Sequence, residues 1–161
     1  MLHSLEIIKP KLDSREYLHY KLPNGIETVL ISDSTTDQSA AALLVEVGYL
    51  FDTVPGIAHF LEHMMFMGSR KYPQENMYQQ YLNQQGGSSN AFTVTDHTLY
   101  YFDIQSEHFD HALDIFGNIF VEPLFNPNSV DREINAVDSE YKKNLNSDPW
   151  KLLDLFQMMS N

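Results

Sequence analysis

The segment His59-Phe60-Leu61-Glu62-His63 restricts the fold more than any other part of this chain, because three of its side chains are useful together only on a helix. At about 100° per residue, an α-helix places positions 59, 62 and 63 on one face. Phe60 and Leu61 then point elsewhere and can anchor the helix in a hydrophobic core. The spacing therefore predicts a helix that is built into the protein and presents two imidazoles and a carboxylate together.

The same three side chains have the chemistry of a catalytic zinc site. Two neutral imidazoles bind Zn²⁺, and a carboxylate on the same face can act as a general base. In the commoner metallopeptidase order, His-Glu-x-x-His, the carboxylate follows the first histidine, whereas here Glu62 precedes His63, which is the inverted order. The alternative is a chance arrangement among seven histidines. Its expected frequency is roughly 2% for a chain of this length and composition.

A catalytic zinc needs a third protein ligand, and the motif helix offers none without distortion. The best candidates are Glu133 and Glu140 in a predicted helix over residues 131–141, seven positions apart on a shared face. Spacing alone leaves two arrangements open: one glutamate binds zinc while the other holds a histidine, or both are solvated surface residues. We expect these glutamates to flank a buried apolar stripe made of Ile134, Val137, Tyr141 and Leu145.

Composition narrows the classes of function. The 161 residues include 22 acidic and 10 basic side chains, a net charge of −12, which makes nucleic acid a poor partner. The absence of cysteine excludes disulfides, zinc ribbons and thiol nucleophiles. The longest strongly apolar run, residues 40–45, is far too short to cross a bilayer, and residues 1–12 lack the apolar core of a signal peptide. We therefore expect a soluble protein without a membrane partner, cytoplasmic or periplasmic.

Periodicity and turn residues predict an α+β fold. Pro23-Asn24-Gly25 separates two β-prone runs, residues 17–22 and 26–31, and Asn-Gly favours the tight turn of a hairpin. Further strands are expected at residues 39–47, 91–95 and 99–104, and helices at residues 56–67, 73–85, 106–121, 128–146 and 149–159. This order predicts one domain over residues 1–161, with an antiparallel or mixed β-sheet and helices packed on one face.

Several blocks of residues recur in the same order in a known family. They are His59 to His63, Gly68, Tyr72-Pro73, Gly87 to Thr93, His97-Thr98, Tyr100 to Phe102 and Arg132 to Glu140. With these blocks the chain resembles the insulinase family of inverted zinc metallopeptidases, in its pitrilysin and insulin-degrading branch. The resemblance implies a metallopeptidase LuxS/MPP-like domain at the N-terminal end of a longer multidomain chain. The apolar residues expected on the helix at 149–159 have few neighbours in sequence to cover them, which also indicates a truncated chain.

The resemblance implies a role for each matched position of the site. His59 and His63 correspond to the two zinc histidines of the family, Glu140 to its third ligand and Glu62 to its catalytic base. Glu133 corresponds to a carboxylate that supports the site from outside the ligand set. One Zn²⁺ per site is the implied cofactor, and hydrolysis of a peptide bond through a metal-activated water is the implied reaction.

Substrate binding is implied on a strand, where Asn90-Ala91 matches the family's segment that hydrogen-bonds the substrate backbone as an added strand. In the family, peptides are enclosed between two homologous halves, and groups that stabilise the oxyanion come from the second half. We therefore expect oligopeptides or small proteins as substrates, the remaining domains of the longer chain as partners, and little turnover from this chain alone. The loop of residues 52–56 is slightly shorter than is typical, and we expect the ligands to stay in place.

Two other functions compete with a zinc endopeptidase. A non-catalytic binding or assembly module of the same fold would have no use for zinc residues, and the intact His59, Glu62, His63 and Glu140 argue against it. A structural zinc site would have a closed fourth position and no need for Glu62. The sequence favours the endopeptidase and leaves the peptide substrate and the oligomeric state open.

Overall fold

The computed structural model describes residues 7–159, apart from the side chain of Gln157. The described residues fall into two compact units that divide between Asp37 and Gln38. The first unit contains one antiparallel hairpin of β1 (Glu16–Lys21) and β2 (Glu27–Ser32). Gly25 has φ 94° at its turn, a conformation that glycine adopts without steric cost. The hairpin expected from Asn24-Gly25 is confirmed.

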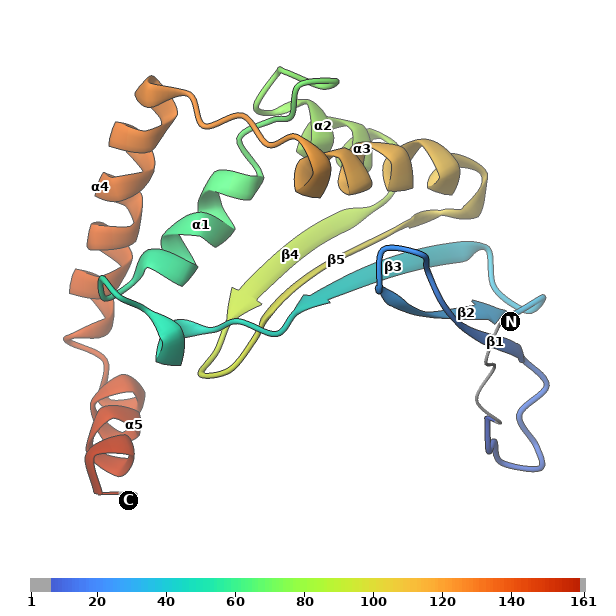
Figure 1. Ribbon diagram of the computed structural model, residues 1–161, viewed down its shortest axis with the longest axis horizontal. Coiled ribbons are helices and arrows are strands. Elements are labelled where there is room, and N and C mark those ends of the chain that lie inside the picture. The colour runs from blue at the N-terminus through green and yellow to red at the C-terminus, as the bar shows by residue number, and fades with distance from the viewer. Residues whose placement is uncertain (1–6, 160–161) are drawn as a thin grey trace. The chain divides into compact units, whose positions relative to one another are not determined.

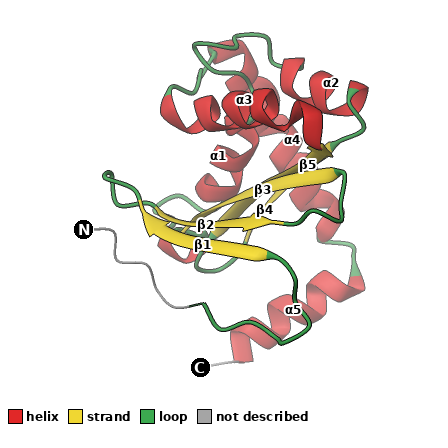
Figure 2. Cartoon of the chain, turned by 90° about the vertical axis from the view of Figure 1, so that its right-hand side faces the viewer, coloured by secondary structure: helices red, strands yellow, loops and turns green. Residues whose placement is uncertain are grey.

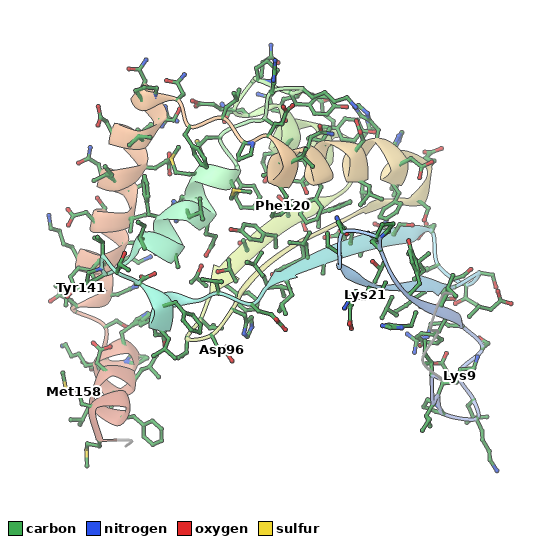
Figure 3. The ribbon with its side chains drawn as sticks, viewed as in Figure 1. Lys9, Lys21, Asp96, Phe120, Tyr141 and Met158 are labelled. Carbon is green, nitrogen blue, oxygen red and sulfur yellow. The ribbon has the colours of Figure 1, made fainter. Side chains whose placement is uncertain are left out.

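The second unit is built on a three-stranded antiparallel sheet in the order β3-β5-β4. Its strands are β3 (Gln38–Val45), β4 (Ser88–Thr93) and β5 (Thr98–Gln105). Strand β5 lies in the centre, and β4 is an edge strand joined to it by a hairpin with Asp96 at its tip (Figure 3). The expected pairing of these two strands is confirmed.

Strand β4 begins three residues earlier than the sequence predicts, because the turn before it is completed by two glycines. Gly86 has φ 68°, and the N–H of Gly87 donates to the carbonyl of Leu82 at 2.8 Å. A Cβ at position 87 would lie 2.3 Å from the carbonyl oxygen of Asp103. The chain therefore turns tightly at these glycines, and the polar residues that follow enter the sheet at once.

Helices lie on one face of this sheet, as Figures 1 and 2 show. They are α1 (Ile57–Met65), α2 (Met77–Gln84) and α3 (Phe109–Val121), with the short 3-10 turns η1 (Tyr49–Phe51) and η2 (Ser106–His108) beside them. The chain ends in α4 (Pro127–Asn144) and α5 (Asp148–Met159). This is the α+β arrangement expected from the sequence, with antiparallel sheets. None of the helices within residues 7–159 combines the length and the apolar character that a bilayer crossing needs.

The core lies between the sheet and α2 and α3. Strand β5 buries every second side chain, Thr98, Tyr100, Phe102 and Ile104, which is the alternation expected of a strand with one covered face. The Phe102 ring lies 5.2 Å from that of Phe116 on α3, and the Phe120 ring packs from α3 onto Tyr100 at 5.0 Å (Figure 3). Truncation of a buried phenylalanine of this kind lowers the stability of a protein by about 3–5 kcal/mol. These aromatic contacts therefore contribute strongly to the packing of α3 on the sheet.

Helix α2 begins at Met77, whereas the sequence predicts a start at Pro73. The N–H of Met77 donates to the carbonyl of Gln74 at 3.1 Å, which closes a turn before the helix. Within this turn, the Glu75 carboxylate accepts hydrogen bonds from Ser129 and Arg132 of α4. Contacts to a helix more than fifty residues away thus hold the segment out of the helical conformation that its own sequence favours.

The prediction of a buried apolar stripe on α4 is wrong for three of its four residues, and the fourth, Val137, is half-buried. Ile134 is 51% exposed, Tyr141 63% and Leu145 49%, whereas Ser129 and Glu133 are buried. The reason is that α4 runs beside α1 (Figure 1), and the side chains of α1 that contact α4 include the polar rings of His59 and His63. The inner face of α4 is consequently the face of its glutamates rather than the apolar one.

Candidate metal centre

The position of α1 is set by the residues that begin it. Gly56 precedes the helix with φ 88°, a left-handed conformation suited to glycine. The Asp52 carboxylate accepts hydrogen bonds from the N–H groups of Gly56 at 2.8 Å and Ala58 at 3.1 Å. These bonds satisfy two donors at the start of the helix that have no partner within it. His59 therefore lies in the first turn, and the loop of residues 52–56 fixes that turn.

His59 and His63 lie next to each other on α1, as their spacing predicts. Their ring centroids are 4.8 Å apart, with the rings edge to face. Helix α4 runs beside α1 (Figure 1) and brings Glu140 to both rings. Its Oε2 lies 3.5 Å from Nε2 of His59 and 3.8 Å from Nε2 of His63. Both ring nitrogens thus face one carboxylate oxygen.

These three side chains fit a metal ion in both donor type and spacing. One ligand atom from each of His59, His63 and Glu140 lies within 4.8 Å of the others. Two ligands bound about 2.1 Å from a tetrahedral zinc ion are about 3.4 Å apart, close to the 3.5 Å and 3.8 Å distances to Glu140. Two imidazole nitrogens and one carboxylate oxygen also form a ligand set found in catalytic zinc sites.

Glu133 lies at the other nitrogen of His63. One of its carboxylate oxygens is 3.1 Å from Nδ1 of His63, and the residue is 8% exposed. A carboxylate oxygen at this distance fits the tautomer of His63 with its proton on Nδ1, and that tautomer leaves Nε2, on the side of Glu140, as the ligand atom. The two glutamates that the sequence left open therefore occupy different places: Glu140 faces the common centre, and Glu133 holds the back of a histidine.

Arg132, Glu75 and Ser129, to which the sequence assigns no role in the site, form a network beside Glu133. Arg132 Nε donates to Glu133 at 3.4 Å, while an Nη atom of Arg132 donates to Glu75 at 2.7 Å. The hydrogen bond from Ser129 to Glu75, aided by Arg132, holds the pKa of Glu75 below its ordinary value, against the opposing effect of burial. The guanidinium group thus joins α4 to the segment before α2 and keeps a positive charge beside the Glu133 carboxylate.

Glu62 is buried on the sheet side of α1, with 8% of its surface exposed. The hydroxyl of Thr93 on β4 donates to its Oε2 at 2.6 Å. Burial, followed by the negative charge of Glu62, raises the pKa of the Tyr100 hydroxyl well above its usual range. The residue that precedes His63 in the sequence, Glu62, thus has one carboxylate oxygen held by β4, the strand that also carries Asn90 and Ala91.

Asn90 and Ala91 lie on β4, the edge strand of the sheet. Asn90 is paired with Tyr101, and Ala91 with Tyr100, on the side of β4 that faces β5. The Asn90 side chain is exposed, and its amide oxygen accepts a hydrogen bond from the N–H of Ala91 at 2.9 Å. These two residues are thus on the strand that contacts α1, two and three positions before the threonine that reaches Glu62.

An α+β fold with two histidines and a glutamate on facing helices, and a second glutamate between the histidines, is the arrangement expected of an inverted metallopeptidase. The model of the insulinase family, peptidase family M16, matches residues 27–161. The chain belongs to this family, as its sequence blocks predict.

Similar proteins agree with this assignment. The chain is 51% identical to an insulin-degrading enzyme of Mus musculus over 158 residues, which are 97% of this chain and 16% of that protein. A Schizosaccharomyces pombe relative with the words zinc protease in its name is 45% identical over 156 residues, 96% of this chain and 16% of that protein. The structure of pitrilysin matches with a TM-score of 0.82 and 38% identity, covering 87% of this chain and 15% of that one. The chain therefore spans about one-sixth of the length of these relatives.

Proposed function

We propose that this chain carries the zinc site of an endopeptidase that hydrolyses oligopeptides or small proteins. The observation that carries the proposal is the convergence of His59, His63 and Glu140, with one ligand atom from each within 4.8 Å of the others. The name of the Mus musculus relative describes a protease that degrades a small protein, which supports the class of substrate. Residues 1–161 would form one domain of a longer chain.

Zn²⁺ would be held by His59, His63 and Glu140. When bound, the zinc ion acts as a Lewis acid, which lowers the pKa of a coordinated water from about 15.7 towards about 7 and polarises the scissile carbonyl. The chain supports this site in two ways. Glu133 keeps His63 in the tautomer that offers Nε2. Glu140 places a carboxylate oxygen 3.5 Å and 3.8 Å from the two Nε2 atoms, a donor set that favours a divalent cation.

Glu62 would act as the general base and then as the general acid. It accepts a proton from the attacking water as the water oxygen forms a bond to the carbonyl carbon. It then delivers that proton to the amide nitrogen as the carbon–nitrogen bond breaks, so that a carboxylic acid and an amine leave. No side chain forms a covalent bond to the substrate in this sequence.

The substrate would lie along β4 as an added strand. An edge strand offers backbone donors and acceptors to an extended peptide, and Asn90 and Ala91 lie on that strand. Because β4 also contacts α1, a peptide bound there runs past Glu62. Binding through the backbone requires no particular side chain of the substrate, which suits a peptidase that acts on varied oligopeptides.

Replacement of Glu62 by glutamine in the full-length protein tests the proposed function. We expect peptide cleavage to fall by about 10²–10⁴-fold, with one zinc per site still bound, because glutamine keeps the shape of the side chain and loses the base. Cleavage is measured with a fluorogenic peptide, and zinc by elemental analysis of the purified protein. Undiminished cleavage by the Glu62→Gln variant, or a wild-type protein without stoichiometric zinc, would refute the endopeptidase. A zinc-loaded wild-type protein that cleaves nothing would favour a binding module.

A further inference from the structure

We propose that Thr93 is a positioning residue, which fixes the carboxylate of Glu62 for proton transfer. This inference rests on the proposed function of Glu62. The Thr93 hydroxyl donates to Oε2 of Glu62 at 2.6 Å across the contact between β4 and α1. Glu62 is 8% exposed, so little solvent competes for this bond. A hydrogen bond to a charged acceptor in such surroundings is among the stronger ones in proteins.

The hydroxyl of Thr98, next to that of Thr93, does not compete for the Glu62 carboxylate. Thr98 lies opposite Thr93 in the β4–β5 pairing, and the two hydroxyl oxygens are 3.3 Å apart. Thr98 gives its own proton to the carbonyl of Val47 at 2.9 Å. Each hydroxyl has a single proton, so the proton of Thr98 goes to the backbone and that of Thr93 goes to Glu62. The two threonines thus form an ordered pair of donors.

The strand holds the donor more firmly than a loop would. Thr93 is β-branched, which restricts its first side-chain torsion, and its backbone is paired with β5. Glu62, in contrast, has three side-chain torsions to fix. With Oε2 held by Thr93, the other oxygen, Oε1, is the one that takes the proton of the attacking water.

Thr93 also relates the base to the proposed substrate. Asn90 and Thr93 belong to the same strand, three residues apart, which is about 10 Å at the rise of a β-strand. The same rigid strand would therefore hold both the bound peptide and the carboxylate of Glu62. This arrangement sets the distance between the scissile bond and the base without a separate element.

The test compares three variants of the full-length, zinc-loaded protein with a fluorogenic peptide. Thr93→Val keeps the shape and removes the donor, so we expect kcat to fall by about 10- to 100-fold while KM and zinc content stay at wild-type values. Thr93→Ser keeps the donor and should restore most of kcat. Thr35→Val is the matched control, because the Thr35 hydroxyl also donates to a carboxylate oxygen, Oδ1 of Asp33, at 2.6 Å and belongs to neither α1 nor β4, and it should retain wild-type kcat.

A measurement without catalysis checks the hydrogen bond itself. In the metal-free full-length protein, Thr93→Val leaves a buried carboxylate oxygen without its donor and should lower the thermal unfolding midpoint of the domain that contains α1 and β4, whereas Thr93→Ser should not. If Thr93→Val does not fold, Thr93→Ala carries the same expectations. Wild-type kcat in the valine or alanine variant, alongside an inactive Glu62→Gln variant, would overturn the positioning role alone. An active Glu62→Gln variant would overturn the proposed function instead.

Discussion

At the scale of single residues, Glu140 and Glu133 lie on different sides of His63, which gives them different expected effects on zinc. Glu140→Gln replaces the proposed carboxylate ligand by an amide oxygen, which binds metal ions more weakly. Zinc affinity should therefore fall by more than about 100-fold. Glu133→Gln changes only a partner of His63, and the loss should be about 10- to 100-fold. Zinc affinity is measured by competition with a chromogenic chelator. The control is Glu122→Gln, an exposed glutamate paired with Arg70, and the opposite ranking would exchange the two roles.

The residues that the sequence places well are those whose relation is local. His59 and His63 are one turn apart on one helix, so their spacing alone predicts that their rings meet. The spacing also predicts Glu62 on the same face, whereas its carboxylate contacts Thr93 of β4. The sequence leaves Glu133 and Glu140 open because their roles depend on how α4 is rotated against α1. Thr93 gives a weaker signal: the alternation of β4 directs it to the inner face of the sheet, but nothing in the sequence states which side chain it meets there.

At the scale of elements, α4 shows why hydrophobic periodicity fails to predict the buried face of a helix that packs through polar side chains. Ile134, Tyr141 and Leu145 have helical spacing, and such spacing usually marks a buried face. Here α4 turns its glutamates towards the histidines of α1, and the apolar side chains remain exposed. The positions of the helices were nevertheless predictable to within a few residues, because caps, turns and proline are local. The rotation of a helix is decided by its partners.

Another consequence at this scale concerns acid stability, through the contact between α4 and the segment before α2. The hydrogen bond from Ser129 lowers the pKa of Glu75 in the folded protein, relative to the ordinary value of 4.5. A depressed folded pKa stabilises the protein above the unfolded value, and this stabilisation is lost as the pH falls through the folded value. Glu75→Gln should therefore be less stable than wild type at neutral pH.

The difference in unfolding free energy between wild type and Glu75→Gln gives the measurement. We expect it to be constant above about pH 5.5 and to shrink steadily as the pH falls below about 4.5. Urea unfolding at a series of pH values checks this, with the plateau at neutral pH as the internal control. A difference that stays the same down to pH 3 would show that the Ser129 and Arg132 contacts do not depend on the charge of Glu75.

At the scale of the whole molecule, the proposed metal site, the proposed base and the edge strand β4 all lie within residues 52–140. Helix α5 exposes large apolar side chains, among them Leu152 at 65% and Phe156 at 71%. The chain spans about 16% of the length of the Mus musculus insulin-degrading enzyme. Binding of zinc depends on side chains that the two facing helices already bring together, whereas stabilisation of the oxyanion needs donors that the proposed site does not include. Metal binding and turnover should therefore be separable.

The 161-residue chain, prepared alone, should show that separation. We expect it to bind one zinc ion, because His59, His63 and Glu140 come from α1 and α4 of a single compact unit. We expect its kcat to be at least about 10²–10³-fold below that of the full-length protein, the loss that follows removal of one oxyanion donor. Zinc titration and cleavage of one fluorogenic peptide by both proteins give the comparison, with the Glu62→Gln variant of each as background. Cleavage by the short chain at the full-length rate would show that the complete catalytic set lies within these residues.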